Sequence, residues 1–303
     1  MAKKSKARKA AVQENGAQGN GVPDVPPPPG FFPFARYASV VGVHTTLLAF
    51  SALFLPRSTE FEALSFLRPV VDSMQLTSRD RPQHPFLDAL TGSPVATLAW
   101  LCVGAAVLQS WWAGWVRAWA IDFALHGAGI ERKLDMARAD ARKFVNLRDA
   151  WLTTAAFSVF FHVLLILFGA PLASHIGQTA LLALLLSLLA VFPSAYTLGS
   201  PFVPASRTAW DRLFAEFSAR TPIERALLYP AAGALAGAWL GVIPIALDWD
   251  RPWQAWPLPP TLGAVLGHIL TSIAALTTSA VRFFADEHLR ATARAHDAKI
   301  KTS

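Results

Sequence analysis

The sequence has little charge and almost no cysteine. Only 16% of its 303 residues are charged and 53% are hydrophobic, with a mean hydropathy of +0.36, whereas soluble domains average roughly 25% charged residues. The single cysteine, Cys102, lies inside an apolar block, which excludes an internal disulfide. These proportions exclude an ordinary soluble domain and indicate an integral membrane protein.

Motifs of several enzyme classes are absent as well. The chain has no Gly-x-Ser-x-Gly, no phosphate-binding loop and no His-Glu-x-x-His. Residues 56–93, the longest segment predicted outside the cytosol, are too few for a catalytic domain with its own core. They contain Asp72, Asp80, His84 and Asp88. Of these, Asp80, His84 and Asp88, at spacings of four, could in principle ligate a metal. Because prolines interrupt this stretch, we interpret it as an ordinary polar loop and predict no catalytic residue, metal or cofactor.

Six apolar segments are long enough for spanning helices, which need about 20 residues. None contains Asp, Glu, Lys or Arg in its interior, and Arg36 lies at the edge of the first. We therefore expect an all-α, polytopic membrane protein with six transmembrane helices. The predicted spans are 34–55, 94–116, 150–170, 176–198, 226–247 and 260–281. A disordered, basic and proline-rich tail (1–33) would precede the membrane domain (34–284), and a second tail (285–303) would follow it.

Lys and Arg residues are distributed unequally between the two sides of these spans. One side, with both tails, carries 21 of the 27, and the other carries five. By the positive-inside rule both termini are cytosolic and residues 248–257 face the lumen or exterior. The first thirty residues hold no apolar run, so we expect an uncleaved anchor rather than a signal peptide. The net charge of +7 lies beside membrane segments, so it does not indicate nucleic-acid binding.

The cytosolic loops contain amphipathic segments. Apolar residues recur at helical spacing within 117–148 and 206–219, which predicts helices lying on the membrane surface. Thr221-Pro222-Ile223-Glu224 fits a capping box with proline at the first helical position. We therefore expect the fifth helix to begin at this point.

The connection between the fifth and sixth spans reads LDWDRPWQAWP, from Leu247 to Pro257. Two prolines stiffen its backbone, and tryptophan rings suit the membrane–water boundary. The acids and the arginine could pair with each other, or the arginine could bind a phosphate-bearing headgroup. We interpret the loop as a rigid surface that contacts a partner or a headgroup. The predicted contact residues are Asp248, Trp249, Asp250, Arg251, Pro252, Trp253, Gln254 and Trp256.

Glycines recur every four residues in the two spans beside this loop. Such spacing lets helix backbones approach closely in lipid. One interpretation is packing of the two helices against each other, and the other is docking of a partner helix. The glycines are Gly233, Gly237, Gly241, Gly263 and Gly267.

Three histidines lie inside the predicted spans, where ionisable groups are functional suspects. They are His44, His162 and His268, and no span supplies a carboxylate partner. Neutral histidines bonded to neighbouring helices are therefore expected, and a proton-coupled transporter is not. At the carboxy terminus, Lys299 and Lys301 match a retrieval signal for the endoplasmic reticulum.

The segment GAWLGVIPIALDWDRPWQAWPLPPTLGAVLGHI, from Gly237 to Ile269, strongly resembles the signature of the PIG-F family. The resemblance covers the last two spans and their loop, and the earlier spans match only in hydropathy and number. Ala246 departs from the family, which tends to have a proline there, and residues 117–148 form a longer loop than in compact members. The first thirty residues look like a lineage-specific tail of a fungal-type member.

The resemblance implies a multi-pass endoplasmic reticulum protein of glycosylphosphatidylinositol (GPI) anchor biosynthesis. It would be a noncatalytic partner of the GPI ethanolamine-phosphate transferase catalytic subunits, which take their donor from phosphatidylethanolamine. Contact with membrane lipids, including phosphatidylethanolamine or GPI precursors, is an open expectation. Direct participation of Asp248, Asp250 and Arg251 in headgroup transfer, or lipid transport, remain alternatives.

The charge asymmetry predicts the side of the membrane on which the loop lies. In a Cys102→Ala background, a cysteine introduced as Ala255→Cys should react with an impermeant maleimide only after the organelle membrane is opened. Epitopes at both termini should be accessible from the cytosol without that step. Labelling of the introduced cysteine in sealed vesicles of cytosol-out orientation would contradict the prediction.

Overall fold

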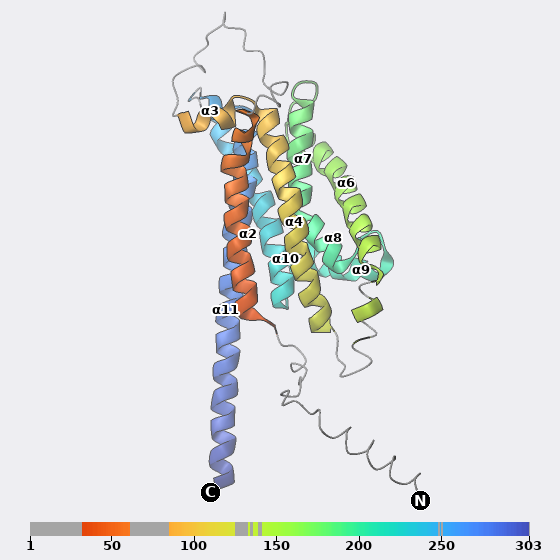
Figure 1. Cartoon of the computed structure of the whole chain (residues 1–303), viewed down its shortest axis with the longest axis vertical. Coiled ribbons are helices and arrows are strands. Elements are labelled where there is room, and N and C mark those ends of the chain that lie inside the picture. The colour runs from red at the N-terminus through yellow and green to blue at the C-terminus, as the bar shows by residue number, and fades with distance from the viewer. Residues whose placement is uncertain are drawn as a thin grey trace, which may run out of the picture.

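The computed structural model describes residues 32–60, 85–124, 133, 136–138, 141–247, 249 and 251–302, without the side chains of 58–60, 85 and 294–302 (Figure 1). The predicted tail 1–33 therefore lies outside the described residues except for its last two positions. Asp72, Asp80 and His84 lie outside them as well.

Within these residues the chain forms helices and turns and no β-strand, which confirms the all-α prediction. Six helical segments are long and apolar enough to cross a membrane. They are Phe34–Arg57, Pro94–Ala124, Lys143–Leu167, Ile176–Leu198, Pro222–Ala246 and Leu258–Ala293. The predicted six-span, multi-pass architecture is confirmed, and the orientation of the termini stays a prediction.

The spans are built from seven α-helices, because the fourth span is divided in two by Pro193, which has no amide hydrogen to donate. A short helix, α3, precedes the second span. The helices are α2 (Phe34–Phe54), α4 (Pro94–Ala124), α6 (Lys143–Leu167), α7 (Ile176–Ala190), α8 (Phe192–Leu198), α10 (Pro222–Leu240) and α11 (Leu258–Thr302), with α3 at Pro85–Thr91.

Several helices end at residues that differ from the approximate boundaries of the predicted spans. The α-helix of the fifth span ends at Leu240 and continues as a 3₁₀ turn, η5 (Ile243–Ala246), because Pro244 cannot continue an α-helical ladder. The second and third spans extend into the predicted loop 117–148. The segment predicted as a tail, 285–303, continues α11 through Thr302, because no glycine or proline follows Gly267.

The segment 206–219, predicted as an amphipathic helix on the membrane surface, is built from two short elements, and its position relative to the membrane stays a prediction. It forms α9 (Pro204–Trp210) and a π-helical turn, η4 (Asp211–Ala215). Trp210, Leu213 and Phe214 pack in the protein core, whereas Phe217 is 66% exposed. Trp210 and Leu213 are buried, and the Trp210 indole donates a hydrogen bond to the Gly199 carbonyl at 2.8 Å. The amphipathic pattern therefore marks a face that packs against the bundle.

The core of the bundle is centred on α7. Seventy-eight per cent of its span is buried inside the protein, compared with 22% for α6, which lies at the edge (Figure 1). α7 packs against α4, α6 and α10, and α11 packs against α10 and α2. Where α2 begins and α4 ends, Tyr37 packs edge-on against Trp119, with ring centroids 5.8 Å apart. α7 therefore holds α10 in place, and α2 holds α11.

A cluster of buried polar side chains lies inside the bundle, where α2, α4 and α11 meet. The Gln109 Nε2 and His268 Nε2 atoms lie 3.2 Å apart, and both side chains are buried. His44 stacks on Trp112, with ring centroids 5.1 Å apart, and its Nε2 has no hydrogen-bond partner among the described residues. The expected bond to a neighbouring helix is therefore found for His268 and not for His44; the Nδ1 atom of His162 also lacks one.

The Gln109–His268 contact should stabilise the bundle measurably. Gln109→Leu removes the partner of a buried imidazole, and an unsatisfied buried polar group costs about 1–3 kcal/mol. We expect a lower midpoint in thermal unfolding of the detergent-solubilised protein. Ser110→Ala is the matched control, because Ser110 bonds only a carbonyl of its own helix, that of Ala106. Equal midpoints for the two variants would contradict the prediction.

Candidate functional site: the hairpin of α10 and α11

The hairpin starts at a fully formed capping box, as the sequence predicts. The amide of Glu224 donates to the Thr221 hydroxyl, and the amide of Thr221 donates to the Glu224 carboxylate, both at 3.1 Å. The amide of Arg220 donates to the same carboxylate at 2.7 Å. Arg212, on η4, forms an ion pair with Glu224. Glu224 therefore joins the start of α10 to the preceding turn.

The five predicted glycines all lie where α10 and α11 touch. A Cβ atom on any of them would lie under 3.0 Å from an atom of the opposite helix, which real Cβ atoms essentially never do. The opposing atoms are mostly backbone: the Gly263 carbonyl faces Gly237, and the Gly267 carbonyl faces Gly233. We call this contact the glycine seam. No side chain larger than hydrogen fits in it.

The glycine seam bears on the two interpretations of these residues. The face of α10 that carries Gly233, Gly237 and Gly241 is covered by α11 of the same chain, so a partner helix would have to bind elsewhere. The opposite face of α10 is open towards the end of the helix, where Leu235 and Trp239 are 39% and 70% exposed. Partner docking through the glycines themselves is therefore not compatible with this packing.

The loop between the helices is closed by a single amide side chain. Gln254 Nε2 donates to the carbonyls of Pro244 and Leu247, each at 2.7 Å. Its Oε1 accepts from the amide of Arg251 at 2.8 Å. Gln254 lies in a 3₁₀ turn, η6 (Pro252–Gln254). One residue thus ties both sides of the loop together.

The tryptophans of the loop have different environments. Trp256 is partly buried and donates from Nε1 to the hydroxyl of Thr179, on α7, at 3.0 Å, which anchors the loop to the bundle. Trp249 and Trp253 pack edge to face, with ring centroids 5.8 Å apart. Trp249 is 53% exposed. The loop therefore presents one large aromatic surface from an otherwise anchored backbone.

Some of the other predicted site residues lie wholly or partly outside the described residues. Asp248 and Asp250 lie outside the described residues, so their pairing with Arg251 stays a prediction. Lys299 and Lys301 lie in the last turns of α11, and their side chains are outside the described part. Among the residues that the structure describes, no three His, Cys, Asp or Glu residues group as a metal site would require.

An apolar cavity of about 240 Å³ adjoins the loop between α6, α7 and α10. Trp239 and Trp256 line it, together with Leu235 and Phe161. A second cavity of about 420 Å³ lies further along α6 and α10, and also includes Leu235 and Phe161. The open face of α10 is thus one side of an apolar surface that starts at the loop.

Sequence reasoning missed two residues that the hairpin depends on. Thr179 holds Trp256, and Gln109 holds His268. Gln109 carried a signal, since it is an amide inside an apolar span. Thr179 carried none, because threonine is common in such segments and its partner is 77 positions away.

Comparison with known proteins places this hairpin within a family. The model of the GPI biosynthesis protein family Pig-F matches residues 83–276, which include α10 and most of the apolar part of α11. No solved structure matches the chain.

Three curated relatives illustrate the similarity. The chain is 44% identical over 121 residues to "Glycosylphosphatidylinositol anchor biosynthesis protein 11" of Pyricularia oryzae, which is 40% of this chain and 42% of that protein. It is 39% identical over 109 residues to the human "GPI ethanolamine phosphate transferase, stabilizing subunit" (36% and 48%). It is 40% identical over 127 residues to protein 11 of Yarrowia lipolytica (40% and 52%). The chain spans about half the length of the relatives it matches.

The glycine seam should not tolerate even one methyl group. Gly237→Ala would place its Cβ against the Gly263 carbonyl, and forcing extra atoms into a packed interface costs about 1–3 kcal/mol. We expect a lower thermal unfolding midpoint in detergent. Gly114→Ala is the control, because nothing lies within 4 Å of a Cβ on Gly114 of α4. A midpoint for Gly237→Ala equal to that of the control would show that the glycine seam does accommodate a methyl group, contrary to the prediction.

Proposed function

This chain belongs to the GPI biosynthesis protein family Pig-F, and from that premise we propose that it is a noncatalytic membrane subunit required for adding ethanolamine phosphate to the GPI glycan. In this role it stabilises or assists the transferase catalytic subunit. The observation that carries the proposal is the similarity to the human protein named as a stabilizing subunit of that transferase. The fungal relatives are named for GPI-anchor biosynthesis.

The geometry supports a binding role for the loop. Its shape is set by Gln254, by Trp256 and by the glycine seam beneath it, so little conformational entropy is lost when a partner binds. Trp249 is the exposed aromatic residue on this rigid base. Tryptophan is enriched among the residues that carry binding energy at interfaces.

We propose that the catalytic subunit contacts the open face of α10 and the adjoining loop. Leu235 and Trp239 would contact a transmembrane helix of that subunit, and Trp249 would contact its part outside the bilayer. This replaces docking through the glycines, whose face is covered by α11. The two surfaces are continuous, because the cavity beside the loop is lined by both Trp239 and Trp256.

The proposed location is the endoplasmic reticulum membrane, with the loop in the lumen. The positive-inside asymmetry of the sequence supports this orientation. Lys299 and Lys301 would then lie on the cytosolic side, where retrieval signals are read.

The proposed interface predicts that Trp239 is needed for binding of the catalytic subunit. Trp239→Ala should weaken co-purification with the catalytic subunit, since a central interface tryptophan contributes about 2 kcal/mol, roughly a 30-fold change in affinity. Cells carrying the variant should accumulate GPI precursors that lack ethanolamine phosphate, measured by mass spectrometry. Trp111→Ala, an exposed tryptophan on α4, is the matched control.

Two outcomes distinguish the parts of this proposal. If Trp239→Ala co-purifies normally and Trp249→Ala does not, the loop alone forms the interface. If the double variant Trp239→Ala/Trp249→Ala shows wild-type co-purification and wild-type precursor levels, neither the α10 contact nor the loop contact exists.

A further inference from the structure

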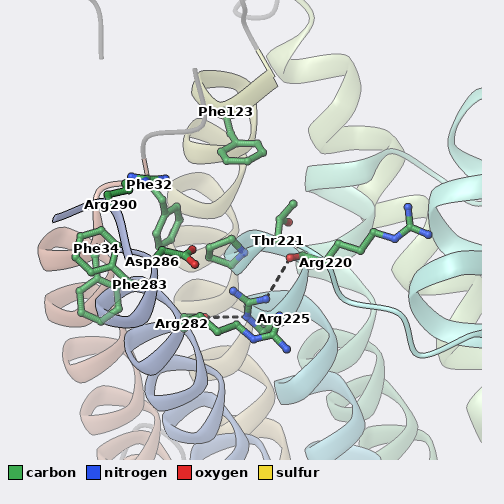
Figure 2. Close-up of a pocket in the computed structure, with 12 residues that line it drawn as sticks. Phe32, Phe34, Phe123, Arg220, Thr221, Arg225, Arg282, Phe283, Asp286 and Arg290 are labelled. Carbon is green, nitrogen blue, oxygen red and sulfur yellow. Dashed lines mark hydrogen bonds between the residues drawn. The ribbon is translucent and has the colours of Figure 1, made fainter. Parts of the chain in front are cut away.

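A third pocket lies at the opposite end of the bundle from the loop. Its volume is about 390 Å³, and it is enclosed by the start of α10, the start of α2 and the part of α11 that follows Ser279 (Figure 2). Four arginines and one aspartate are among its lining residues, which leaves a net charge of +3. The charged residues are Arg220, Arg225, Arg282, Arg290 and Asp286. We call it the arginine pocket.

Arg225 is a buried cation without a carboxylate partner among the described residues. It is only 3% exposed. Its Nε donates to the Ser279 hydroxyl at 3.1 Å and its Nη1 donates to the Arg220 carbonyl at 3.2 Å. The neighbouring Glu224 is already paired with Arg212. Burying a charge is costly unless an opposite charge compensates it, so this position favours an anion.

Arg282 adds a second positive charge at the same place. Figure 2 shows its side chain beside that of Arg225, and Asp286 comes one turn later on α11. Neither Arg282 nor Asp286 forms an ion pair within the described part of the chain. Two adjacent guanidinium groups repel each other, and a phosphate group relieves this repulsion by accepting hydrogen bonds from both.

The pocket also has an apolar wall. Phe34 of α2 stacks on Phe283 of α11, with ring centroids 5.4 Å apart and planes 10° apart, and both residues line the pocket with Phe32 and Phe123. An inorganic ion has no apolar atoms to pack against such a wall, whereas the glycerol and upper acyl carbons of a lipid can pack against it. The position fits as well, because α11 changes from apolar to charged residues just after Val281.

We propose that the arginine pocket binds the phosphate of an anionic membrane lipid. Arg225 and Arg282 hold the phosphate, Arg220 and Arg290 supply attraction at the rim, and the phenylalanines contact the apolar part of the lipid. Basic pockets between transmembrane helices on the cytoplasmic side are suited to the headgroups of such lipids. The pocket is separate from the hairpin loop, so this inference does not depend on the identity of the partner.

The test uses the full chain purified in a neutral detergent. Dioctanoyl phosphatidic acid is the probe, dioctanoyl phosphatidylcholine is the zwitterionic comparison, and binding is measured by native mass spectrometry and by titration. We expect phosphatidic acid to bind and phosphatidylcholine not to. Arg225→Gln and Arg282→Gln should each weaken binding about tenfold. Arg148→Gln should leave binding unchanged, because Arg148 is exposed and pairs with Asp149.

Titration with inorganic phosphate distinguishes the two sources of the same chemistry. If phosphatidic acid binds and phosphate does not displace it, the ligand is a lipid. If phosphate binds equally tightly and loses affinity in the same variants, the phosphate site stands and its ligand is soluble. Failure of both probes to bind the wild-type protein, or unchanged binding in Arg282→Gln, would overturn the proposal. Arg282 is exposed, so this variant serves even if Arg225→Gln does not fold.

Discussion

The close approach of α10 and α11 is the constraint on which the rest of the structure depends. In a bilayer, hydrophobicity does not drive helices together, so packing and polar contacts must do so. Glycine achieves this here by removing side chains from the contact: carbonyls of one helix occupy the space where Cβ atoms of the other would lie. The geometry has little tolerance, because those atoms belong to the backbone and cannot move aside.

The rigidity of the loop follows from this contact. Two helices in backbone contact bring Pro244 and Leu247 close to η6, within reach of the Gln254 amide. Trp256 then fixes the loop to α7 through Thr179. Trp249 is left 53% exposed on the outside of the loop. The same contact that excludes a partner from the inner face of α10 thus makes its outer face and the loop a defined surface.

The two ends of the bundle differ in chemistry. The end with the loop presents tryptophans and an apolar cavity, and the other presents arginines around a pocket. α10 connects the two: it begins at a capping box held by Glu224 and ends beneath the loop. Because Glu224 is used by Arg212 and by backbone amides, Arg225 forms no ion pair with a carboxylate of the described residues. The structural role of Glu224 therefore leaves the positive charge of the neighbouring Arg225 uncompensated.

The sequence by itself determined the features that depend on neighbouring residues along the chain. The six spans follow from apolar length, since a spanning segment must satisfy its own backbone hydrogen bonds, and the capping box follows from two residues three positions apart. The family signature identified the loop. Only the tertiary structure decided that α11 covers the glycine face of α10, and that Trp210 and Leu213 pack inward. It also decided that Gln109 meets His268, 159 positions later. These outcomes depend on which helices become neighbours, and a local pattern of residues carries no record of that choice.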